Sequence, residues 1–301
     1  MAHMETFLGI DVGISGIRVV TIDAMGVLVG KAEQLLESNS LQGLIHEQDP
    51  ASWWHLICTL VQQVNGKLSE KLDAYETRAV SVTSTSGTLV LAYETGSVVR
   101  PAMMYDDSRS TAEADHLNDC FENGSHHWNC SNSLCKALWV QNYEESVWCT
   151  VRYILSPADW LLSRLTGNYG ISDYSNSLKL GYDFDLRTWL PAVRASGIPG
   201  DLLPSVVAPA TCIGKIFPQA ASATQLPQTC SMVTGATDGL ASLIASGAKT
   251  PGDANTTWAP RLSGRLLQLI SLRPAKVSTL IVTPWGSGHL VPPVVQVLVR
   301  S

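Results

Sequence analysis

The fold is decided by residues 7–23, which read Phe-Leu-Gly-Ile-Asp-Val-Gly-Ile-Ser-Gly-Ile-Arg-Val-Val-Thr-Ile-Asp. This stretch predicts a strand over 7–10 ending at Asp11, a turn in which Gly13 and Gly16 permit positive φ, and a second strand over 17–22. Backbone N–H groups in such a turn can bind phosphate oxygens. Asp11 can hold Mg²⁺ through water, because Mg²⁺ usually keeps several of its waters. An ordinary hairpin with an exposed aspartate fits this stretch equally well.

A second informative stretch, residues 232–247, reads Met-Val-Thr-Gly-Ala-Thr-Asp-Gly-Leu-Ala-Ser-Leu-Ile-Ala-Ser-Gly. A short apolar run reaches Gly235, and Asp238 precedes an amphipathic helix of small residues that begins near Leu240. An acid at such a strand-to-helix turn is well placed to act as a base. The structural alternative is that Asp238 caps the helix, and one residue can serve both roles.

Together, and in this order, the two stretches resemble the N-terminal half of the FGGY carbohydrate kinases, which have the ribonuclease-H-like (actin-like) ATPase superfold. The resemblance spans residues 6–257. Other stretches that resemble family landmarks are Glu47-Gln-Asp-Pro-Ala-Ser-Trp-Trp54, Thr83-Ser-Thr-Ser-Gly-Thr88, Tyr105-Asp-Asp-Ser-Arg109, Ala158-Asp-Trp-Leu161 and Ser172-Asp-Tyr-Ser-Asn-Ser-Leu-Lys179. Residues 85–88 and 175–182 most resemble the ribulose and xylulose kinases of plants and cyanobacteria.

The resemblance implies an ATP-dependent kinase that transfers the γ-phosphate to a hydroxyl of D-ribulose or D-xylulose, with ATP and Mg²⁺ as cofactors. Asp238 matches the catalytic base, which also contacts the sugar. Asp11 matches the acid that faces the metal and the phosphates. The residues that match the first phosphate loop are Gly13, Ser15, Gly16 and Arg18.

One position of this loop departs from the family. Ile14 stands where the family usually has Thr, whose hydroxyl can donate to a phosphate oxygen. Losing such a bond costs on the order of 1.5–3 kcal/mol of phosphate interaction. The departure weakens the kinase interpretation without excluding it.

The resemblance also implies a sugar pocket. Ser86 and Gly87 match its edge, although both are common turn residues. Tyr105, Asp107 and Arg109 match a sugar-facing wall with a supporting ion pair, and a solvated ion pair beside a loop fits these residues almost as well.

We expect an α/β domain with a mixed sheet, begun by an antiparallel hairpin, and flanking helices at 51–66 and 151–166. Irregular or helical insertions are expected at 107–150 and 180–220. At least one of Trp53 and Trp54 is predicted to lie in the core, because apolar residues recur after them at helical spacing, and Trp160 is predicted to serve packing. The resemblance implies that the second domain of the family is missing. We therefore expect the apolar cleft face that it would cover to be exposed and to mediate self-association.

Composition limits the partners. The net charge of −6 argues against nucleic acid. No apolar run approaches the roughly 20 residues that span a bilayer, so no membrane partner is expected. Seven cysteines without a Cys-x-x-Cys pair indicate reduced thiols. No targeting peptide is visible, and we expect a cytoplasmic protein, or a chloroplast one if a transit peptide is missing from this sequence.

The last part of the chain differs in composition. Residues 258–301 contain no Asp or Glu and five Lys or Arg. Shifting the reading frame after Thr257 allows a Leu-Gly-Thr-Thr-Leu-Val-Trp-Lys segment that resembles the second phosphate-binding motif of the family. We therefore predict a sugar-binding domain at 1–257 and an out-of-frame or poorly ordered tail at 258–301. The whole chain is expected to have low or no kinase activity; the alternative is a non-catalytic sugar-binding fragment or a regulatory splice variant.

Overall fold

A computed structural model describes residues 4–36, 43–71, 74–121 and 126–247, together with short strands at 254–255, 269–270 and 278–280. The chain divides into two compact units, Met1–Asp238 and Gly239–Ser301. The predicted boundary after residue 257, and the predicted tail apart from two of these short strands, lie outside the described residues.

The first unit is built on a six-stranded mixed sheet with the order β13-β14-β5-β1-β2-β3. Strand β2 pairs antiparallel with both β1 and β3. By contrast, β1 pairs in parallel with β5, and β5 pairs in parallel with β14. The strands are β1 (Met4–Val12), β2 (Gly16–Asp23), β3 (Leu28–Leu35), β5 (Tyr75–Ser84), β13 (Cys212–Lys215) and β14 (Ser231–Val233). The predicted mixed sheet that begins with an antiparallel hairpin is therefore confirmed.

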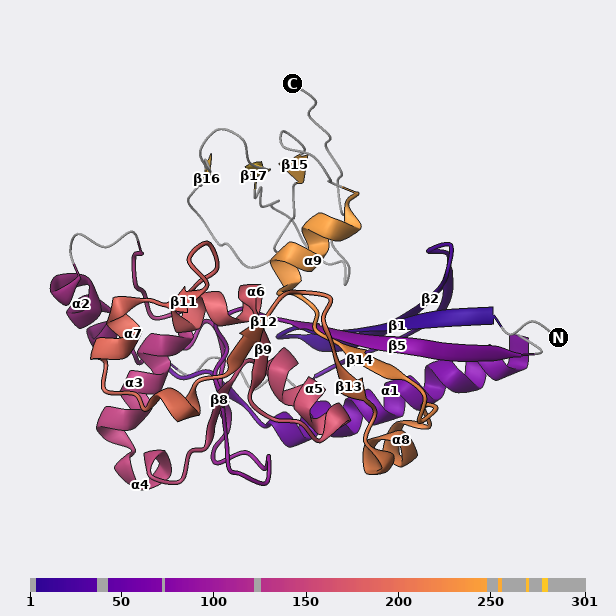
Figure 1. The fold of residues 1–301 in the computed structure, drawn as a ribbon, viewed down its shortest axis with the longest axis horizontal. Helices are drawn as coiled ribbons and strands as arrows, with labels where there is room; N and C mark the ends of the chain where they lie inside the picture. Colours follow the sequence, from indigo (N-terminus) through magenta and orange to yellow (C-terminus); the bar gives the residue numbers. More distant parts are fainter. Residues whose placement is uncertain are drawn as a thin grey trace. The chain divides into compact units, whose positions relative to one another are not determined.

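Three helices pack on one face of this sheet: α1 (Pro50–Lys71), α5 (Pro157–Thr166) and α8 (Pro218–Thr224). They lie along the same side of the strands in Figure 1. Alternate side chains of β1, namely Leu8, Ile10 and Val12, are buried against them, as the pleat of a strand requires. Trp53 of α1 is fully buried and Trp160 of α5 nearly so, which confirms their predicted packing roles.

The predicted helix over 151–166 is wrong at its start but correct at its end. Residues Tyr153–Leu155 form strand β8, which pairs with β6 (Val90–Ala92), and the helix begins only at Pro157. Ser156 explains this boundary: its side chain accepts a hydrogen bond from the Asp159 amide, and Asp159 in turn accepts from the Ser156 amide. This reciprocal cap, followed by proline at the first helical position, fixes the start of α5.

Both predicted insertions contribute to a second hydrophobic core beside the sheet, which includes Trp128, Leu134 and Val193. Their main elements are α2 (Thr111–Cys120), α3 (Ser133–Tyr143), α4 (Glu145–Trp148), η1 (Leu178–Leu180), β10 (Tyr182–Asp183), β11 (Thr188–Trp189), α7 (Pro191–Ala195), η2 (Gly200–Leu202) and β12 (Ser205–Val207). β4 (Glu47–Gln48) pairs with β7 (Ala102–Met103), and β9 (Ile171–Asp173) precedes α6 (Tyr174–Ser177) and pairs with β12. These elements pack together as a layer of their own at one end of the sheet (Figure 1). The prediction of an insertion up to residue 220 is wrong at its end, because β13 belongs to the six-stranded sheet and α8 begins at Pro218.

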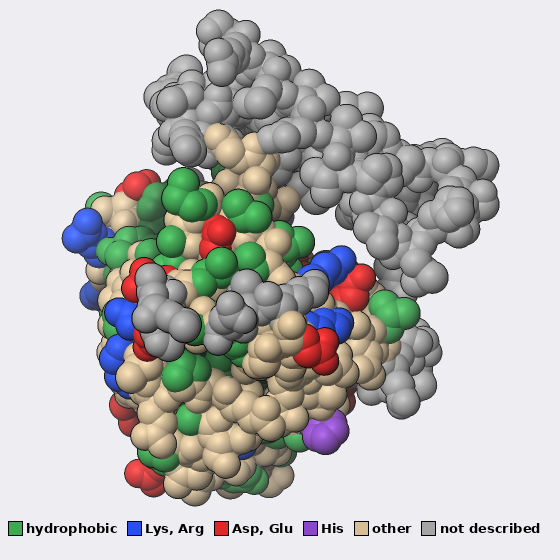
Figure 2. All heavy atoms as spheres, turned by 90° about the vertical axis from the view of Figure 1, so that its right-hand side faces the viewer, with side chains coloured by type: hydrophobic (Ala, Val, Ile, Leu, Met, Phe, Trp, Pro, Cys, Tyr) green, Lys and Arg blue, Asp and Glu red, His purple; other side chains and the backbone are tan. Residues whose placement is uncertain are grey.

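The sheet face opposite α1 carries exposed apolar side chains. Phe7 and Ile22 lie directly opposite each other on β1 and β2, and each is 37% exposed. Figure 2 shows one side of the molecule, on which apolar side chains lie among charged and polar ones. No helix within the described residues is both long and apolar enough to cross a bilayer.

In the second unit, α9 (Asp238–Ala245) starts at the unit boundary. Three short strands follow, β15 (Ala254–Asn255), β16 (Leu269–Ile270) and β17 (Ser278–Leu280), in the order β15-β17-β16.

Candidate active site

Three parallel strands bring the two predicted acidic residues to one edge of the sheet. Asp11 near the end of β1 is in register with Thr83 of β5, and Ser84 of β5 forms a bridge with Thr237 after β14. Asp238 follows Thr237 directly. The carboxyl ends of parallel strands at a topological switch point are a common ligand site in α/β sheets.

Gly235 allows the segment before Asp238 to run close to β5. A Cβ atom at this position would lie 2.2 Å from the Val82 carbonyl oxygen, so only glycine fits without a backbone shift. One residue later, the Ala236 carbonyl accepts a hydrogen bond of 2.7 Å from the Thr83 hydroxyl. The Thr237 amide donates to the Ser175 hydroxyl of α6 at 3.1 Å. These contacts fix the backbone that carries Asp238.

Asp11 lies in an ion pair across the hairpin. The Arg18 Nη1 donates to its Oδ2 at 2.9 Å, and both side chains are partly exposed. Since Ile10 and Val12 point toward the helices, Asp11 points to the opposite face of the sheet. The carboxylate therefore remains accessible to a ligand at the strand end.

The turn after Asp11 differs from its prediction in one respect: neither Gly13 nor Gly16 has a positive φ. Gly16 is required for another reason, because a Cβ atom there would lie 2.7 Å from the Gln34 carbonyl oxygen of β3. Ser15 is exposed, and no hydrogen bond within the described residues uses the amides of Ile14 or Ser15. Those amides are available to an anion.

Ile14 has a structural role in place of the missing hydroxyl. Its side chain packs against the main hydrophobic core, and its carbonyl accepts a hydrogen bond of 3.0 Å from Gln48 Nε2. Gln48 in turn accepts from the indole N–H of buried Trp53 at 2.9 Å. The phosphate-loop candidate is thus anchored to the start of α1.

The Ser86–Gly87 turn follows β5 at the same sheet edge. Gly87 has a φ of +82°, and a Cβ atom there would lie 2.0 Å from the Ser131 carbonyl oxygen. The Ser86 carbonyl accepts a hydrogen bond from Lys179 Nζ at 3.3 Å, and the Ser131 hydroxyl accepts one from the same nitrogen at 3.2 Å. The turn therefore packs between η1, which carries Lys179, and the loop before α3, which carries Ser131.

Asp107 and Arg109 form a buried ion pair, so the solvated alternative is wrong. Asp107 is fully buried and accepts from the backbone amide of His46 at 2.9 Å and from Arg109 Nη2 at 2.8 Å. Burial opposes the charge of Arg109, but hydrogen bonds to Asp107 and Glu47 raise the pKa of its guanidinium above the usual value. Its guanidinium also stacks on Trp139, with 4.6 Å between Cζ and the ring centroid.

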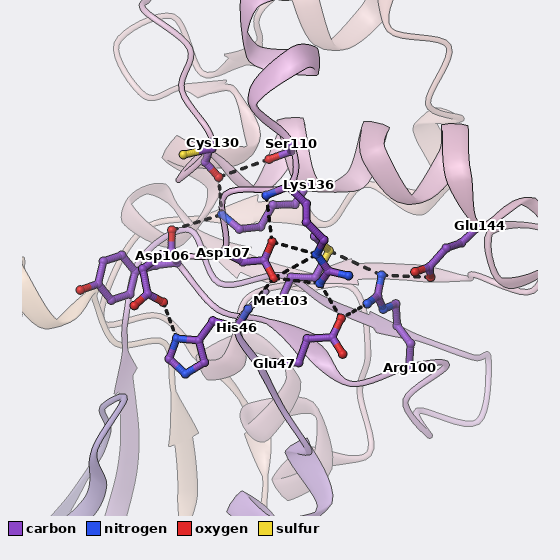
Figure 3. A network of polar contacts seen from close by, with 12 residues as sticks. His46, Glu47, Arg100, Met103, Asp106, Asp107, Ser110, Cys130, Lys136 and Glu144 are labelled. Atoms are coloured by element: carbon purple, nitrogen blue, oxygen red, sulfur yellow. Dashed lines mark hydrogen bonds and ion pairs between the residues drawn. The ribbon is translucent and has the colours of Figure 1, made fainter. Parts of the chain in front are cut away.

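The ion pair belongs to a larger network of polar contacts (Figure 3). Arg100 bonds to Glu47 and, at 3.0 Å, to Glu144. His46 Nδ1 lies 2.7 Å from Asp106 Oδ1. Asp107 and Arg109 thus hold the loop around Tyr105 in place and do not themselves line an open pocket, whereas Tyr105 is 36% exposed.

Two lysines beside this loop were not assigned a role from the sequence. Lys136 of α3 is fully buried and donates to the carbonyls of Cys130, at 2.6 Å, and Tyr105, at 3.3 Å. Burial, and then the charge of Lys179, lowers its pKa to about 8. Burial also lowers the pKa of Lys179, while the carboxylate of Asp238 opposes this shift. Lys179 ends the stretch 172–179, which resembles a family landmark. The spacing of residues along the chain could not show that its side chain reaches the Ser86–Gly87 turn.

The phosphate side of the site fits a nucleotide with Mg²⁺. No cluster of three His, Cys, Asp or Glu side chains able to hold a metal occurs within the described part of the chain. Mg²⁺ is usually held by one or two carboxylates together with substrate phosphates. Asp11, the exposed Ser15 and the amides of the turn provide one carboxylate and several donors, which matches that chemistry.

Comparisons with known proteins identify related sequences and folds. The pattern of the FGGY family of carbohydrate kinases, N-terminal domain, matches residues 6–245. A xylulose kinase from Klebsiella pneumoniae is 25% identical over 257 residues, covering 82% of this chain and 51% of the relative. The crystal structure of xylulose kinase from Rhodospirillum rubrum has a TM-score of 0.78 and 22% identity, covering 83% of this chain and 53% of that one.

A Plasmodium falciparum glycerol kinase with ADP has a TM-score of 0.77 and 17% identity, covering 85% of this chain and 53% of that one. These structures confirm the predicted actin-like ATPase fold with its mixed sheet and flanking helices. This chain spans about half the length of the relatives that it matches.

Proposed function

The chain belongs to the FGGY family of carbohydrate kinases, and from this we propose that residues 6–245 form the sugar-binding part of an ATP-dependent kinase acting on a pentulose hydroxyl. One observation carries the proposal. Asp11, the Ser86–Gly87 turn and Asp238 are held at the ends of three adjacent parallel strands. A phosphate-facing acid and a base on one rigid edge are what in-line phosphoryl transfer requires.

In this proposal Asp238 accepts the proton of the sugar hydroxyl as its oxygen attacks the phosphorus. Catalysis of this kind is mainly positioning, because the protein forms no covalent bond to the phosphoryl group. The contacts of Thr237 with Ser84 and with Ser175 hold the backbone of Asp238 for this role.

The phosphate side consists of Asp11, Gly13, Ser15, Gly16 and Arg18. Bound ATP would supply the phosphoryl group, and Mg²⁺ near Asp11 would offset charge on the phosphates. The Ser15 hydroxyl and the exposed amides donate to phosphate oxygens, and Arg18 orients the Asp11 carboxylate through their 2.9 Å contact. The side chain of Ile14 packs against the core and carries no hydroxyl, so this loop binds phosphate with one side-chain donor fewer than a threonine would give.

On the sugar side, the proposal assigns the contacts with the sugar to Ser86, Gly87 and Tyr105, whereas the buried pair of Asp107 and Arg109 holds the loop that carries Tyr105. The xylulose kinases among the relatives make a pentulose the proposed substrate class, and D-ribulose and D-xylulose are the two candidates.

The proposal is tested on the full chain with two measurements. Titration calorimetry measures the binding of D-ribulose, D-xylulose and glycerol, and a coupled assay measures ADP release. We expect pentulose binding in the wild type and its clear weakening in Asp238→Asn. As a matched control we choose Asp115→Asn, which changes an exposed carboxylate of α2.

Three outcomes separate the possibilities. Sugar-dependent ADP release that is lost in Asp238→Asn supports catalysis by this chain. Binding without release supports the alternative, a sugar-binding protein without transfer activity. Failure of the wild type to bind any of the three compounds contradicts both.

A further inference from the structure

Lys179 is a charged side chain that joins three parts of the site. It lies in η1, and its ammonium donates to the Ser86 carbonyl at 3.3 Å and to the Ser131 hydroxyl at 3.2 Å. Gly87 packs against the same side chain, because a Cβ atom there would lie 2.6 Å from Lys179 Cδ. Lys179 therefore contacts both Ser86 and Gly87, which form the edge of the proposed sugar pocket.

The segment that carries Lys179 is also tied to the candidate base. Ser175 of α6, four residues before Lys179, accepts a hydrogen bond from the Thr237 amide at 3.1 Å. Ser175 is itself held by Asp173, whose carboxylate accepts from its hydroxyl at 2.6 Å. Since Asp238 follows Thr237, these bonds fix α6 and η1 beside the base.

The two neutral acceptors, the Ser86 carbonyl and the Ser131 hydroxyl, do not explain why residue 179 carries a charge. Removing an ammonium from water is unfavourable unless a charge or several acceptors compensate, and a neutral donor could serve a carbonyl and a hydroxyl alone. Among the described residues, the carboxylate of Asp238 at the start of α9 favours the charge of Lys179, and the ammonium of Lys136 in α3 opposes it. The thiol of Cys130, in the loop before α3, is a further titratable group that interacts with Lys179.

An ammonium has three N–H donors, and the bonds to Ser86 and Ser131 use two of them. We propose that Lys179 is a specificity-determining residue whose third N–H donates to a sugar oxygen beside the hydroxyl that donates to Asp238. Because the charges of Lys179 and Asp238 attract each other, each also favours the ionised form of the other. The site would thus recognise a vicinal pair of oxygens, one as donor and one as acceptor. This inference rests on the proposed sugar binding and names a contact within it.

The test compares Lys179→Met and Lys179→Gln with a matched control, Lys215→Met. Lys215 also donates to a carbonyl and to a serine hydroxyl, those of Thr229 and Ser231, but on the exposed edge strand β13. Titration calorimetry with D-ribulose and D-xylulose is run on the full chain between pH 5 and pH 8. We expect Lys179→Met to bind about tenfold more weakly or worse, and Lys215→Met to bind like the wild type.

Lys179→Gln separates charge from hydrogen bonding and keeps the test valid if the methionine variant does not fold. We expect this variant to lose affinity toward acid at a higher pH than the wild type does. Pentuloses lacking the hydroxyl at C3 or C4 are measured as well. One of these two deoxy compounds should bind the wild type more weakly than the full pentulose does. Lys179→Met should bind that compound and the full pentulose equally well.

The inference fails if both Lys179 variants bind as the wild type does. It also fails if glutamine restores the affinity together with its pH dependence, because Lys179 would then be a structural donor only. If the wild type binds no sugar at all, the proposed function itself is wrong.

Discussion

Asp159 makes the stability of the domain depend on pH, and Asp159→Asn should remove this dependence. Asp159 lies at the start of α5 and is 3% exposed. Its Oδ2 accepts from the Ser156 amide at 3.1 Å and from the Ser172 hydroxyl at 2.8 Å. Burial, with a further contribution from the negative charge of Asp173, raises the pKa of Asp159 from 3.8 to about 7.

The magnitude follows from linkage. A shift of about three pH units at 1.36 kcal/mol per unit corresponds to about 4 kcal/mol. The folded state holds the proton more tightly than the unfolded chain, so this stabilisation is complete below pH 4. It is lost progressively as the pH rises through 7.

Asparagine keeps an accepting oxygen for Ser156 and Ser172 but cannot ionise. We therefore expect the free energies of unfolding to be similar near pH 4, and Asp159→Asn to be more stable than the wild type by about 4 kcal/mol at pH 8. Urea unfolding followed by circular dichroism from pH 4 to pH 8 measures this difference. Asp115→Asn, at an exposed position, is the control. A difference between Asp159→Asn and the wild type that stays constant across this range would refute the reasoning.

Three further predictions follow from contacts in the first unit. Gly87→Ala should lose roughly 2 kcal/mol or more of folding stability and weaken sugar binding, because φ is +82° and the Ser131 carbonyl is in the way; Gly26→Ala, with φ of +79° and open space, should lose less. Denaturant titration compares the two. Arg109→Met should cost about 3–5 kcal/mol in unfolding free energy because it leaves buried Asp107 without its cation, and the double variant with Asp107→Asn should recover part of that loss; equal stability of single and double variants would contradict this. Ile22→Lys should reduce self-association in sedimentation velocity, since it places a charge on the exposed apolar sheet face, and a wild type that is monomeric at all concentrations would contradict the expectation.

The features that sequence predicted well are those set by local pattern. The strand–turn–strand pattern of residues 7–23 predicted the β1–β2 hairpin, and helical spacing after Trp53 predicted that α1 packs into the core. The strand, turn and helix around Asp238 also occur in the predicted order, although the helix begins at Asp238 and not near Leu240. Each of these depends on residues close together in the chain.

The features that sequence did not predict depend on contacts between distant segments. Gly16 looked like a turn glycine, yet it is required by the backbone of β3. The sequence left open whether the ion pair of Asp107 and Arg109 is solvated, because its burial depends on Glu47 and Trp139, which are far away in sequence. The same holds for Lys179, whose acceptor at Ser86 is separated from it by 93 positions. No local pattern can report such contacts.

The close approach at Gly235 has a consequence for mutational scanning. Every substitution there must displace the Val82 carbonyl or the strand that carries it, because the space for a Cβ atom is already filled. A scan scored on function would therefore give Gly235 the same low score as Asp238, the proposed base three residues later, although glycine offers no side chain to a substrate. Scoring abundance beside activity would separate the two positions: we expect Gly235 variants to be depleted in both, and Asp238→Asn in activity alone.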